Sequence, residues 1–484
     1  MMKYIRYAFL LIFTCSLPLW AQLEKPDLVL EGTVTVAQNH THFYIPFTVP
    51  SGVHRISVDF SYDHRREEKT VFNIGIHDPA GFRGQSGSNK DHFTIGPGDA
   101  TPSYIPGSIP PGQWKFLISV SNIRPEITSK YRVEIRFNSP LEDASFTLDP
   151  LEINLRWYRG DLHMHTAHSD GFCGSQNEKH VPCPLFLTAQ TATNRGLDFI
   201  AISDHNSIAH YAEMRELQPY FDKLLLIPGR EMTTFYGHFN AFGVTQYIDY
   251  LVAEKNGRTI DEVVHDIQSM GGIASINHPM SPTGEACRGC GWTPPAPVDM
   301  SKFTGIEVVN SGRVMDAFWD QQLAKGLRLT AIGGSDNHDA TKAEDQRGAL
   351  AHPTTVVQAK ELSVAGILDG VRAGHVFIDV TGSRNKLLEV EAITSAATAH
   401  MGDTLAARSG DDLRLHVHVV ACAQDQVHML VDEKTTGEPL PVRDDDQALD
   451  TRWMSDGARH WVRFVVLDAA GNTVLLGNPI YVNF

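Results

Sequence analysis

One short stretch of the chain, residues 159–171, constrains its fold and chemistry more than any other. It reads RGDLHMHTAHSDG and carries three histidines and two aspartates. If residues 161–165 form a strand, His163 and His165 point to the same face, because side chains alternate along a strand. Two imidazoles on one face form a metal-binding pair, to which Asp170, just beyond the strand, adds a carboxylate. The stretch therefore predicts a metal site near the end of a strand.

Two other His-x-His pairs show that this pattern alone is a weak signal. They are His40 with His42 and His416 with His418. We interpret both as the solvent faces of ordinary strands. What distinguishes the pair in residues 159–171 is the series of metal-capable residues that follows it along the chain.

Length and charge limit the class of protein. The 484 residues are too many for one hydrophobic core, so we expect two or three domains. Apolar residues make up 42% of the chain, which is ordinary for a globular protein and does not indicate extensive disorder. The net charge of -16 argues against nucleic-acid binding, which requires clustered Lys and Arg. A small anionic substrate held by metal ions is compatible with this charge.

The first residues, 1–21, are typical of a signal peptide. Lys3 and Arg6 form a basic start, and the apolar run of residues 7–20 is short and contains a proline, unlike a membrane span. We therefore expect export to the periplasm or the outside of the cell, with no stable membrane span after the leader is removed. The alternative is an uncleaved N-terminal anchor.

Five cysteines follow the leader, and in an exported protein disulfides are the default. Cys173 and Cys183 bracket one loop, and Cys287 and Cys290 lie in another. These four residues are compatible with two disulfides or with a four-thiolate zinc site, and the leader favours disulfides. Cys422 lies in a predicted strand, where we expect a buried, inert thiol.

The periodicity of apolar residues divides the chain into three parts. Residues 28–150 alternate apolar and polar positions between turns, which predicts a β-sandwich module that either packs against the rest of the chain or binds a ligand. Residues 156–385 alternate strand-like and helical runs, the rhythm of a β/α barrel of about seven strands. One of its helices begins with a capping box, Thr259 to Glu262. Residues 386–484 return to an all-β pattern and predict a small C-terminal β-sandwich.

Metal-capable residues recur in the barrel segment at or just after the ends of its predicted strands, where barrels keep their active sites. Each residue alone is more often a surface or core residue than a ligand. Five such clusters at equivalent positions are hard to explain in that way. Their nitrogen and oxygen donors suit Zn, Mn or Fe better than Ca or Mg. The donors are His163, His165, Asp170, His205, Glu231, His238, His278, Asp336 and His338.

Five motifs carry a resemblance to a known family. They are DLHMHTAHSDG, FIAISDHN, PGREMTTFYGHFN, INHP and GGSDNH, in this order along the chain. Together they resemble the polymerase-and-histidinol-phosphatase (PHP) superfamily of metal-dependent hydrolases. The details look like the CehA/McbA-type branch, which is named for carbamate-ester hydrolases. The resemblance is strong over residues 156–380 and weak in the C-terminal module.

The resemblance implies a distorted (β/α)7 barrel that holds two to three divalent metal ions. Its first metal position would use His163, His165, Glu231 and Asp336. Its second would use Glu231, His238 and His278, with Glu231 bridging the two. Its third would use Asp170, His205 and His338. All nine ligand positions of the family are filled, which argues against a degenerate domain.

Two further residues are assigned roles near this site. Asp204 is expected to orient a ligand histidine rather than to bind metal. Arg313 is either a clamp for an anionic transition state or a surface arginine before a helix. His168 is interpreted as a bystander.

These features predict an exported metal-dependent hydrolase that cleaves ester bonds of a small molecule, with a metal-held hydroxide as nucleophile. The ester is a phosphoester, as in the superfamily, or a carbamate or carboxyl ester, as in the branch. The alternative is a non-catalytic or accessory metal-binding protein that recognises a glycan or an envelope component.

Overall fold

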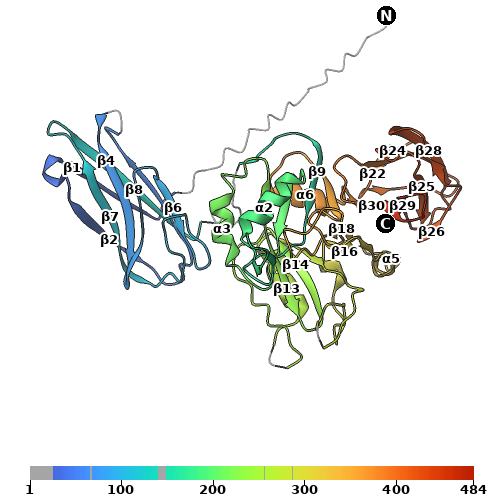
Figure 1. Cartoon of the computed structure of the whole chain (residues 1–484), viewed down its shortest axis with the longest axis horizontal. Helices are drawn as coiled ribbons and strands as arrows, with labels where there is room; N and C mark the ends of the chain where they lie inside the picture. The colour runs from blue at the N-terminus through green and yellow to red at the C-terminus, as the bar shows by residue number, and fades with distance from the viewer. Residues whose placement is uncertain (1–24, 66–67, 140–148, 256, 286) are drawn as a thin grey trace, which may run out of the picture.

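The chain is a multidomain, strand-rich protein, seen here in a computed structural model. The structure describes residues 25–65, 68–139, 149–255, 257–285 and 287–484. Figure 1 shows an N-terminal β-module, a central domain with helices and a C-terminal β-module in succession along the long axis. The predicted signal peptide lies outside the described residues. Within the described ranges, no helix combines the length and the apolar character that crossing a bilayer requires.

The N-terminal module is a pair of four-stranded antiparallel sheets. Its strands are β1 (Leu28–Thr35), β2 (His42–Val49), β3 (Ile56–Tyr62), β4 (Val71–Asp78), β5 (Gly81–Ser86), β6 (His92–Ile95), β7 (Gly112–Asn122) and β8 (Thr128–Phe137). One sheet has the order β1-β8-β3-β6 and the other β2-β7-β4-β5. Trp114, Phe116, Ile118 and Val120, every second residue of β7, are buried in one core that both sheets share. The alternation read from the sequence is therefore the packing pattern of a sandwich.

A buried acidic side chain joins this module to the central domain. Asp99 forms ion pairs with Arg55 of its own module and with Arg215. Arg215 belongs to α3 (His210–Leu217) of the central domain. Nearby, Ile208 lies so close to Gly98 that a β-carbon there would be 2.6 Å from the Ile208 side chain.

The central domain is built on a mixed sheet that curves around the metal-capable residues. Its strands are β9 (Arg156–Asp161), β12 (Phe199–Ile202), β13 (Leu225–Thr234), β14 (Gly237–Phe242), β15 (Ile273–Ile276), β16 (Gly305–Asn310), β18 (Thr330–Gly334), β19 (Thr354–Ala359) and β20 (Val376–Asp379). Hydrogen bonds connect them in the order β20-β19-β9-β12-β13-β14-β15-β16-β18. The wider strand network, which includes C-terminal strands, closes on itself.

The regular (β/α)7 barrel expected from the sequence is not confirmed. β9, β12 and β13 are parallel, as are β15, β16 and β18. However, β13 and β14 form an antiparallel hairpin, and β14 also runs antiparallel to β15. β19 is antiparallel to both β9 and β20. A hairpin needs no crossover helix, so these pairings break the strand–helix alternation.

Helices cover the outside of this sheet. They are α2 (Leu185–Asn194), α3, α4 (Ile260–Ser269), α5 (Ala317–Ala324) and α6 (Val364–Ala373). The predicted capping box of α4 is confirmed, because the Thr259 hydroxyl accepts from the Glu262 amide and the Glu262 carboxylate accepts from Thr259. Val263, Val264 and Ile267 form its buried face, as the 3.6-residue period requires.

The C-terminal module is continuous with the central domain across the expected boundary at residue 386. Its sheets contain β21 (Leu387–Ile393), β22 (Thr398–His400), β23 (Thr404–Leu405), β24 (Asp412–Val420), β25 (Gln426–Val431), β28 (Asp446–Met454), β29 (His460–Leu467), β30 (Thr473–Gly477) and β31 (Ile480–Val482). β30 pairs antiparallel with β20, and the core of the module includes Val356 and Phe377 of the central domain.

Two polar side chains reinforce this junction. The Asn478 amide group is buried and bonds to the backbone of Ala331 and Val376, so it ties β18 to β20. Arg463 is buried beside Asp316 and Asp320 at the start of α5, at 3.0 Å from each carboxylate. The central and C-terminal parts therefore share strands, core and buried polar contacts.

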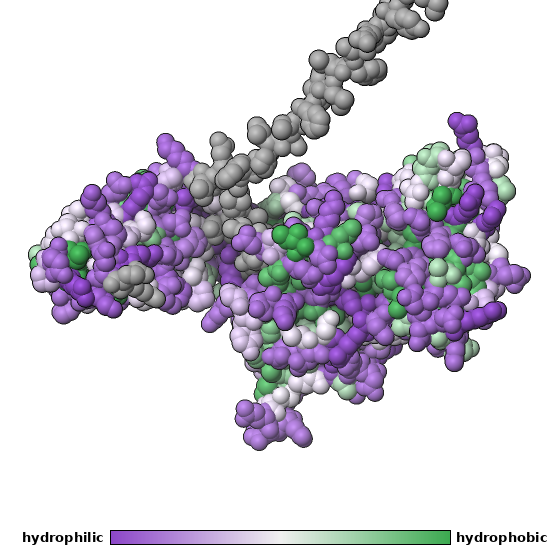
Figure 2. Space-filling model, turned by 90° about the horizontal axis from the view of Figure 1, so that it is seen from above, coloured by the Kyte–Doolittle hydropathy of each residue, from purple (hydrophilic) through white to green (hydrophobic). Residues whose placement is uncertain are grey.

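The surface in Figure 2 is mostly hydrophilic, with hydrophobic residues in small groups.

Candidate metal centre

The histidine pair lies just after β9, the first strand of the central domain. β9 ends at Asp161, earlier than the predicted 161–165 strand. The chain nevertheless stays extended, because Met164 bridges Asn337. Leu162 and Met164 are buried in apolar clusters, so His163 and His165 both face the opposite side. The predicted alternation thus holds beyond the strand itself.

The first donor group contains His163, His165 and Asp336. The Nε2 atoms of the two histidines each lie 3.3 Å from Asp336 Oδ1. They lie 3.4 Å and 3.5 Å from the carboxylate oxygens of Glu231, which follows the parallel part of β13. All four residues of the first predicted position therefore converge.

The second donor group contains Glu231, His238 and His278. His238 Nδ1 and His278 Nε2 each lie 3.3 Å from Glu231 Oε1. The hairpin of β13 and β14 brings Glu231 and His238 together, and His278 follows β15. Glu231 borders both the first and the second group, as the bridging role requires.

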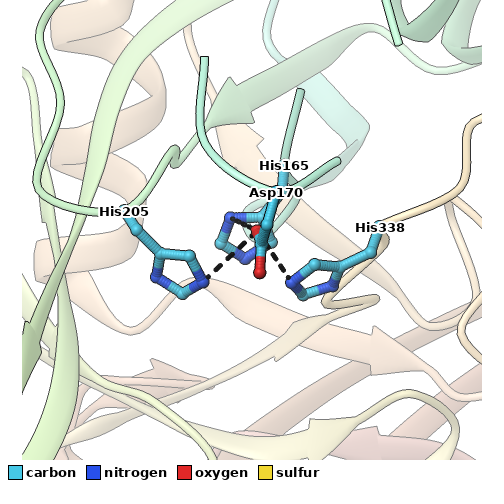
Figure 3. Close-up of side chains that lie close together, drawn as sticks. All are labelled: His165, Asp170, His205 and His338. Carbon is cyan, nitrogen blue, oxygen red and sulfur yellow. Dashed lines mark ion pairs between the residues drawn. The ribbon is translucent and has the colours of Figure 1, made fainter. Parts of the chain in front are cut away.

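The third donor group contains His165, Asp170, His205 and His338 (Figure 3). Asp170 Oδ1 lies 3.5 Å from His205 Nε2 and 3.3 Å from His338 Nε2. The His165 ring stacks against the rings of both His205 and His338, with centroids 4.3 Å and 4.1 Å away. The structure thus adds His165 to the three residues predicted from the sequence.

The distances between the donor atoms match those between the ligands of a divalent cation. A tetrahedral cation with bonds of about 2.0–2.1 Å places its ligand atoms about 3.3–3.4 Å apart. The separations of 3.3–3.5 Å between the nitrogens and carboxylate oxygens are close to this value. The buried Nε2 atoms of His163 and His165 have no hydrogen-bond partner, and metal coordination would satisfy both.

The carboxylates and imidazoles shift one another's pKa values. Burial penalises the charged form of His163, but Asp336 and Glu231 outweigh it and raise its pKa well above the usual value. Burial dominates at His165 and lowers its pKa to about 4, which keeps the ring neutral for metal binding. The hydrogen bond to His338 lowers the pKa of Asp170 to about 2. The site therefore has ionised carboxylates and a strong attraction for positive charge.

Two buried side chains orient the ligands. Asn277 donates to Glu231 Oε1 at 2.8 Å. Glu307, on β16, lies 3.0 Å from His163 Nδ1 and accepts from the His278 amide at 2.8 Å. Glu307 also belongs to a group of potential donors with His163 and His278. Glu307 is not among the residues predicted from the sequence, where its one signal is an acid inside the apolar run 305–309.

The other predicted residues lie around the site. Asp204 is buried and accepts from the Thr166 backbone and from the Thr166 and Ser169 hydroxyls, so it reaches His165 only through Ser169. His168 pairs with Glu213 at 2.9 Å and belongs to none of the donor groups found among the described residues. Arg313 is exposed on the short strand β17 (Arg313–Val314), and its role as a clamp stays a prediction.

One of the two expected disulfides is present. Cys287 and Cys290 are bonded, whereas Cys173 and Cys183 are buried thiols. The second expected bridge and the four-thiolate zinc site are therefore wrong for this structure. Cys173 and Cys183 pack with Ala340 in a small apolar cluster, and burial raises the pKa of Cys183. Cys422 is a buried thiol, as expected.

The fold and the site define a multidomain, strand-rich protein with adjoining side-chain groups able to hold divalent metal ions. No family model matches the chain. The uncharacterized protein MJ1587 of Methanocaldococcus jannaschii is 28% identical over 130 residues, which are 26% of this chain and 71% of that protein.

Solved structures resemble the chain at low identity. One is a two-domain protein from Bacteroides vulgatus that contains a predicted PHP-like metal-dependent phosphoesterase. It is 19% identical, with a TM-score of 0.38, over 68% of this chain and 96% of its own. PsfC from Pseudomonas syringae is 16% identical, with a TM-score of 0.30, over 44% of this chain and 88% of its own. These similarities do not establish a family.

Proposed function

We propose that the chain is a multinuclear, PHP-type metal-dependent hydrolase that cleaves ester bonds of a small molecule outside the cytoplasm. The observation that carries this proposal is the contiguity of the three donor groups. Glu231 links the first group to the second, and His165 links the first to the third. Two or three cations held side by side are the arrangement that metal-assisted hydrolysis uses.

Metal ions bound here would lower the pKa of a bound water and polarise the oxygen of the scissile ester. The chain's own residues set where this happens. The second group is buried, and so are the two histidines of the first, with Glu231 and His163 each only 1% exposed. The third group is open, because the Asp170 side chain is 59% exposed and that of His338 is 32% exposed. We therefore place substrate entry at the third group.

Two ester classes are compatible with this site. A phosphoester is the substrate that the superfamily resemblance implies, and a carbamate or carboxyl ester is the one that the CehA/McbA-type details imply. The nine donors serve either class, because both reactions need the same activated water. Arg313, exposed beside β16, is the residue we propose to favour an anionic substrate.

The test combines metal analysis with two chromogenic substrates, an aryl phosphate and an aryl carbamate. We expect two to three equivalents of Zn, Mn or Fe in the purified protein and turnover of one substrate. The double variant His163→Ala/His165→Ala should lose metal and turnover while the β-modules stay folded, as circular dichroism can check. Unchanged metal content in that variant would contradict the site. Metal binding without turnover of either ester would support the accessory metal-binding alternative.

A further inference from the structure

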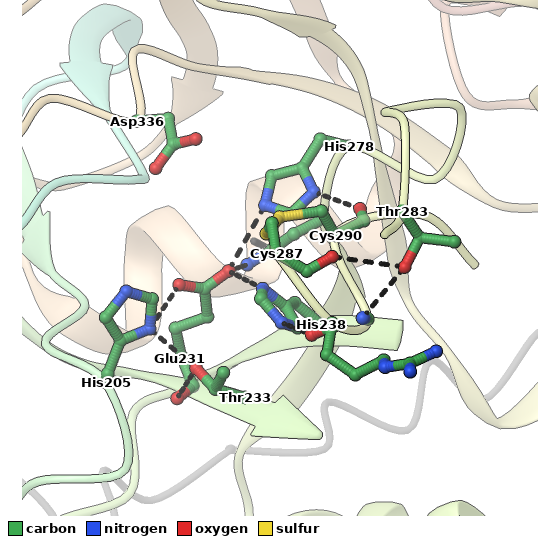
Figure 4. The surroundings of a disulfide bond; sticks show 12 residues. His205, Glu231, Thr233, His238, His278, Thr283, Cys287, Cys290 and Asp336 are labelled. Carbon is green, nitrogen blue, oxygen red and sulfur yellow. Dashed lines mark hydrogen bonds and ion pairs between the residues drawn. A yellow bond between two sulfur atoms is a disulfide. The ribbon is translucent and has the colours of Figure 1, made fainter. Parts of the chain in front are cut away.

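The Cys287–Cys290 disulfide lies beside His238 and His278 of the second donor group (Figure 4). We call residues 287–290 the disulfide turn. Gly289 packs on the hairpin of β13 and β14, where a β-carbon would be 2.0 Å from the Thr234 carbonyl oxygen. Its φ of +80° is a conformation that favours glycine. Backbone geometry therefore seats the turn closely on the hairpin that carries Glu231 and His238.

The turn presents two backbone carbonyls to two ligand histidines. His278 Nδ1 lies 2.7 Å from the Cys290 carbonyl oxygen, and His238 Nε2 lies 3.4 Å from that of Arg288. Each histidine faces Glu231 with its other nitrogen, at 3.3 Å. A ring that donates its N–H to a carbonyl leaves the lone pair of its second nitrogen free for a metal.

The Thr283 hydroxyl forms hydrogen bonds with two backbone groups of the disulfide turn. Thr283 Oγ1 donates to the Cys287 carbonyl at 3.2 Å and accepts from the Gly289 amide at 3.0 Å. The disulfide closes the same four residues covalently. Both features limit the positions of the two carbonyls, because they remove conformations that an open loop would sample.

We propose that the disulfide turn is a positioning device for the second metal position, and that its covalent closure holds His238 and His278 in their ligand orientations. This inference rests on the proposed metal site. It makes the affinity of one position depend on the oxidation state of Cys287 and Cys290, while the first and third positions have no such contact among the described residues. Loss of groups that orient metal ligands typically lowers metal affinity 10–100-fold.

The direct test opens the disulfide in the full-length protein in two independent ways. A water-soluble phosphine reduces the bond: with one water it yields two thiols and the phosphine oxide. The double variant Cys287→Ser/Cys290→Ser removes the bond and leaves no thiol to bind metal. Zinc or manganese affinity is then measured by competition with a chromogenic chelator. We expect one equivalent to bind about 10–100-fold more weakly and the others to be unchanged.

Matched controls separate positioning from general damage. Cys422→Ser removes a buried thiol away from the site and should leave all affinities unchanged. The phosphine should have no effect on the Cys287→Ser/Cys290→Ser variant. Thr283→Val removes the bracing hydroxyl and should weaken the same equivalent, whereas Thr283→Ser keeps the hydroxyl and should restore it. The Thr283→Val and Thr283→Ser variants test the positioning role even if the Cys287→Ser/Cys290→Ser variant folds poorly.

The outcomes distinguish this inference from the proposed function. If the wild type binds metals and the opened forms bind all of them with unchanged affinity, the positioning role is wrong and the metal site stands. If every equivalent weakens equally, the disulfide supports the fold and not one position, which also overturns the inference. If the wild type binds no metal, the inference and the proposed function both fail.

Discussion

Glu231 is the side chain that the donor groups share. Its two carboxylate oxygens lie within 3.5 Å of nitrogens from five histidines: His163, His165, His205, His238 and His278. Those rings outweigh the cost of burial and hold the pKa of Glu231 well below its usual value. The carboxylate is therefore ionised whenever the protein is folded near neutral pH, and its charge is available to two cations.

Glu231→Gln removes this charge and keeps the shape of the side chain. We expect the first and second positions to lose metal, with affinity lowered by at least about tenfold, because an amide is a weaker ligand and cannot bridge as an anion. Elemental analysis after dialysis against a chelator measures the loss. Glu213→Gln, which changes the partner of His168 outside the donor groups, is the matched control. Full metal retention in Glu231→Gln would contradict the bridging role.

Metal affinity should rise with pH over the neutral range. Burial disfavours charging of His278, but Glu231 outweighs it and raises the pKa of His278 to about 9 in the metal-free site. Below that pH a metal must displace the proton, so affinity falls as pH falls, by up to about tenfold per pH unit for one proton. Chelator competition between about pH 6 and about pH 8 measures this slope. A flat profile would show that no proton is displaced.

At the residue scale, nine candidate donors were predicted because histidines and acids clustered at strand ends, and the structure brings these nine together in three groups. Glu307 was missed for a physical reason. An acid in an apolar strand faces either solvent or an interior partner, and only the pairing of β16 between β15 and β18 decides which. Arg313 was predicted as a clamp for an anion or as a surface arginine, and its exposed position on β17 leaves the clamp a prediction.

At the element scale, the sequence predicted the start of a helix correctly, but it did not predict which strands pair antiparallel. The capping box placed the start of α4, since it depends on residues three apart in the chain. The hairpin of β13 and β14 lacks an Asn-Gly or Asp-Gly turn, because Phe235 and Tyr236 connect its two strands. β19 and β20 are separated by the helix α6, a spacing that predicts a parallel crossover and not the antiparallel pair observed.

Asn478 tests the element-scale junction between β18 and β20. Its amide donates to the Ala331 and Val376 carbonyls and accepts from the Ala331 amide, in a buried position. We expect Asn478→Ala to lower the free energy of unfolding by about 1–3 kcal/mol, because backbone groups lose their partners. Urea unfolding measures this change. The exposed Asn385→Ala is the control, expected within about 0.5 kcal/mol of wild type. Equal effects would contradict a specific role of Asn478.

At the scale of the whole molecule, the two β-modules are attached differently. The N-terminal module has a core of its own, whereas the C-terminal module shares its core and a strand pair with the central domain. The sequence predicted both modules from their alternation. It did not predict this asymmetry, because β20 and β30 are nearly a hundred residues apart and nothing local links them.

Removing the N-terminal module and removing the C-terminal module should therefore have opposite results. A chain of residues 149–484 should fold and keep its metal equivalents, because every donor lies between residues 163 and 338. A chain that ends at residue 385 should aggregate, because it exposes Phe377 and leaves β20 without its partner β30. Size-exclusion chromatography with metal analysis compares the two. A soluble, metal-loaded chain ending at residue 385 would contradict the shared core.

The pairing of β30 with β20 also sets an order of events during synthesis. β30 supplies the neighbour of β20, and Asn478 binds the backbone of β18, the strand from which Asp336 and His338 follow. A chain that emerges N-terminus first cannot complete this pairing until β30 has been synthesised. The three donor groups are therefore completed only after β30, well after His338, the last of their own residues.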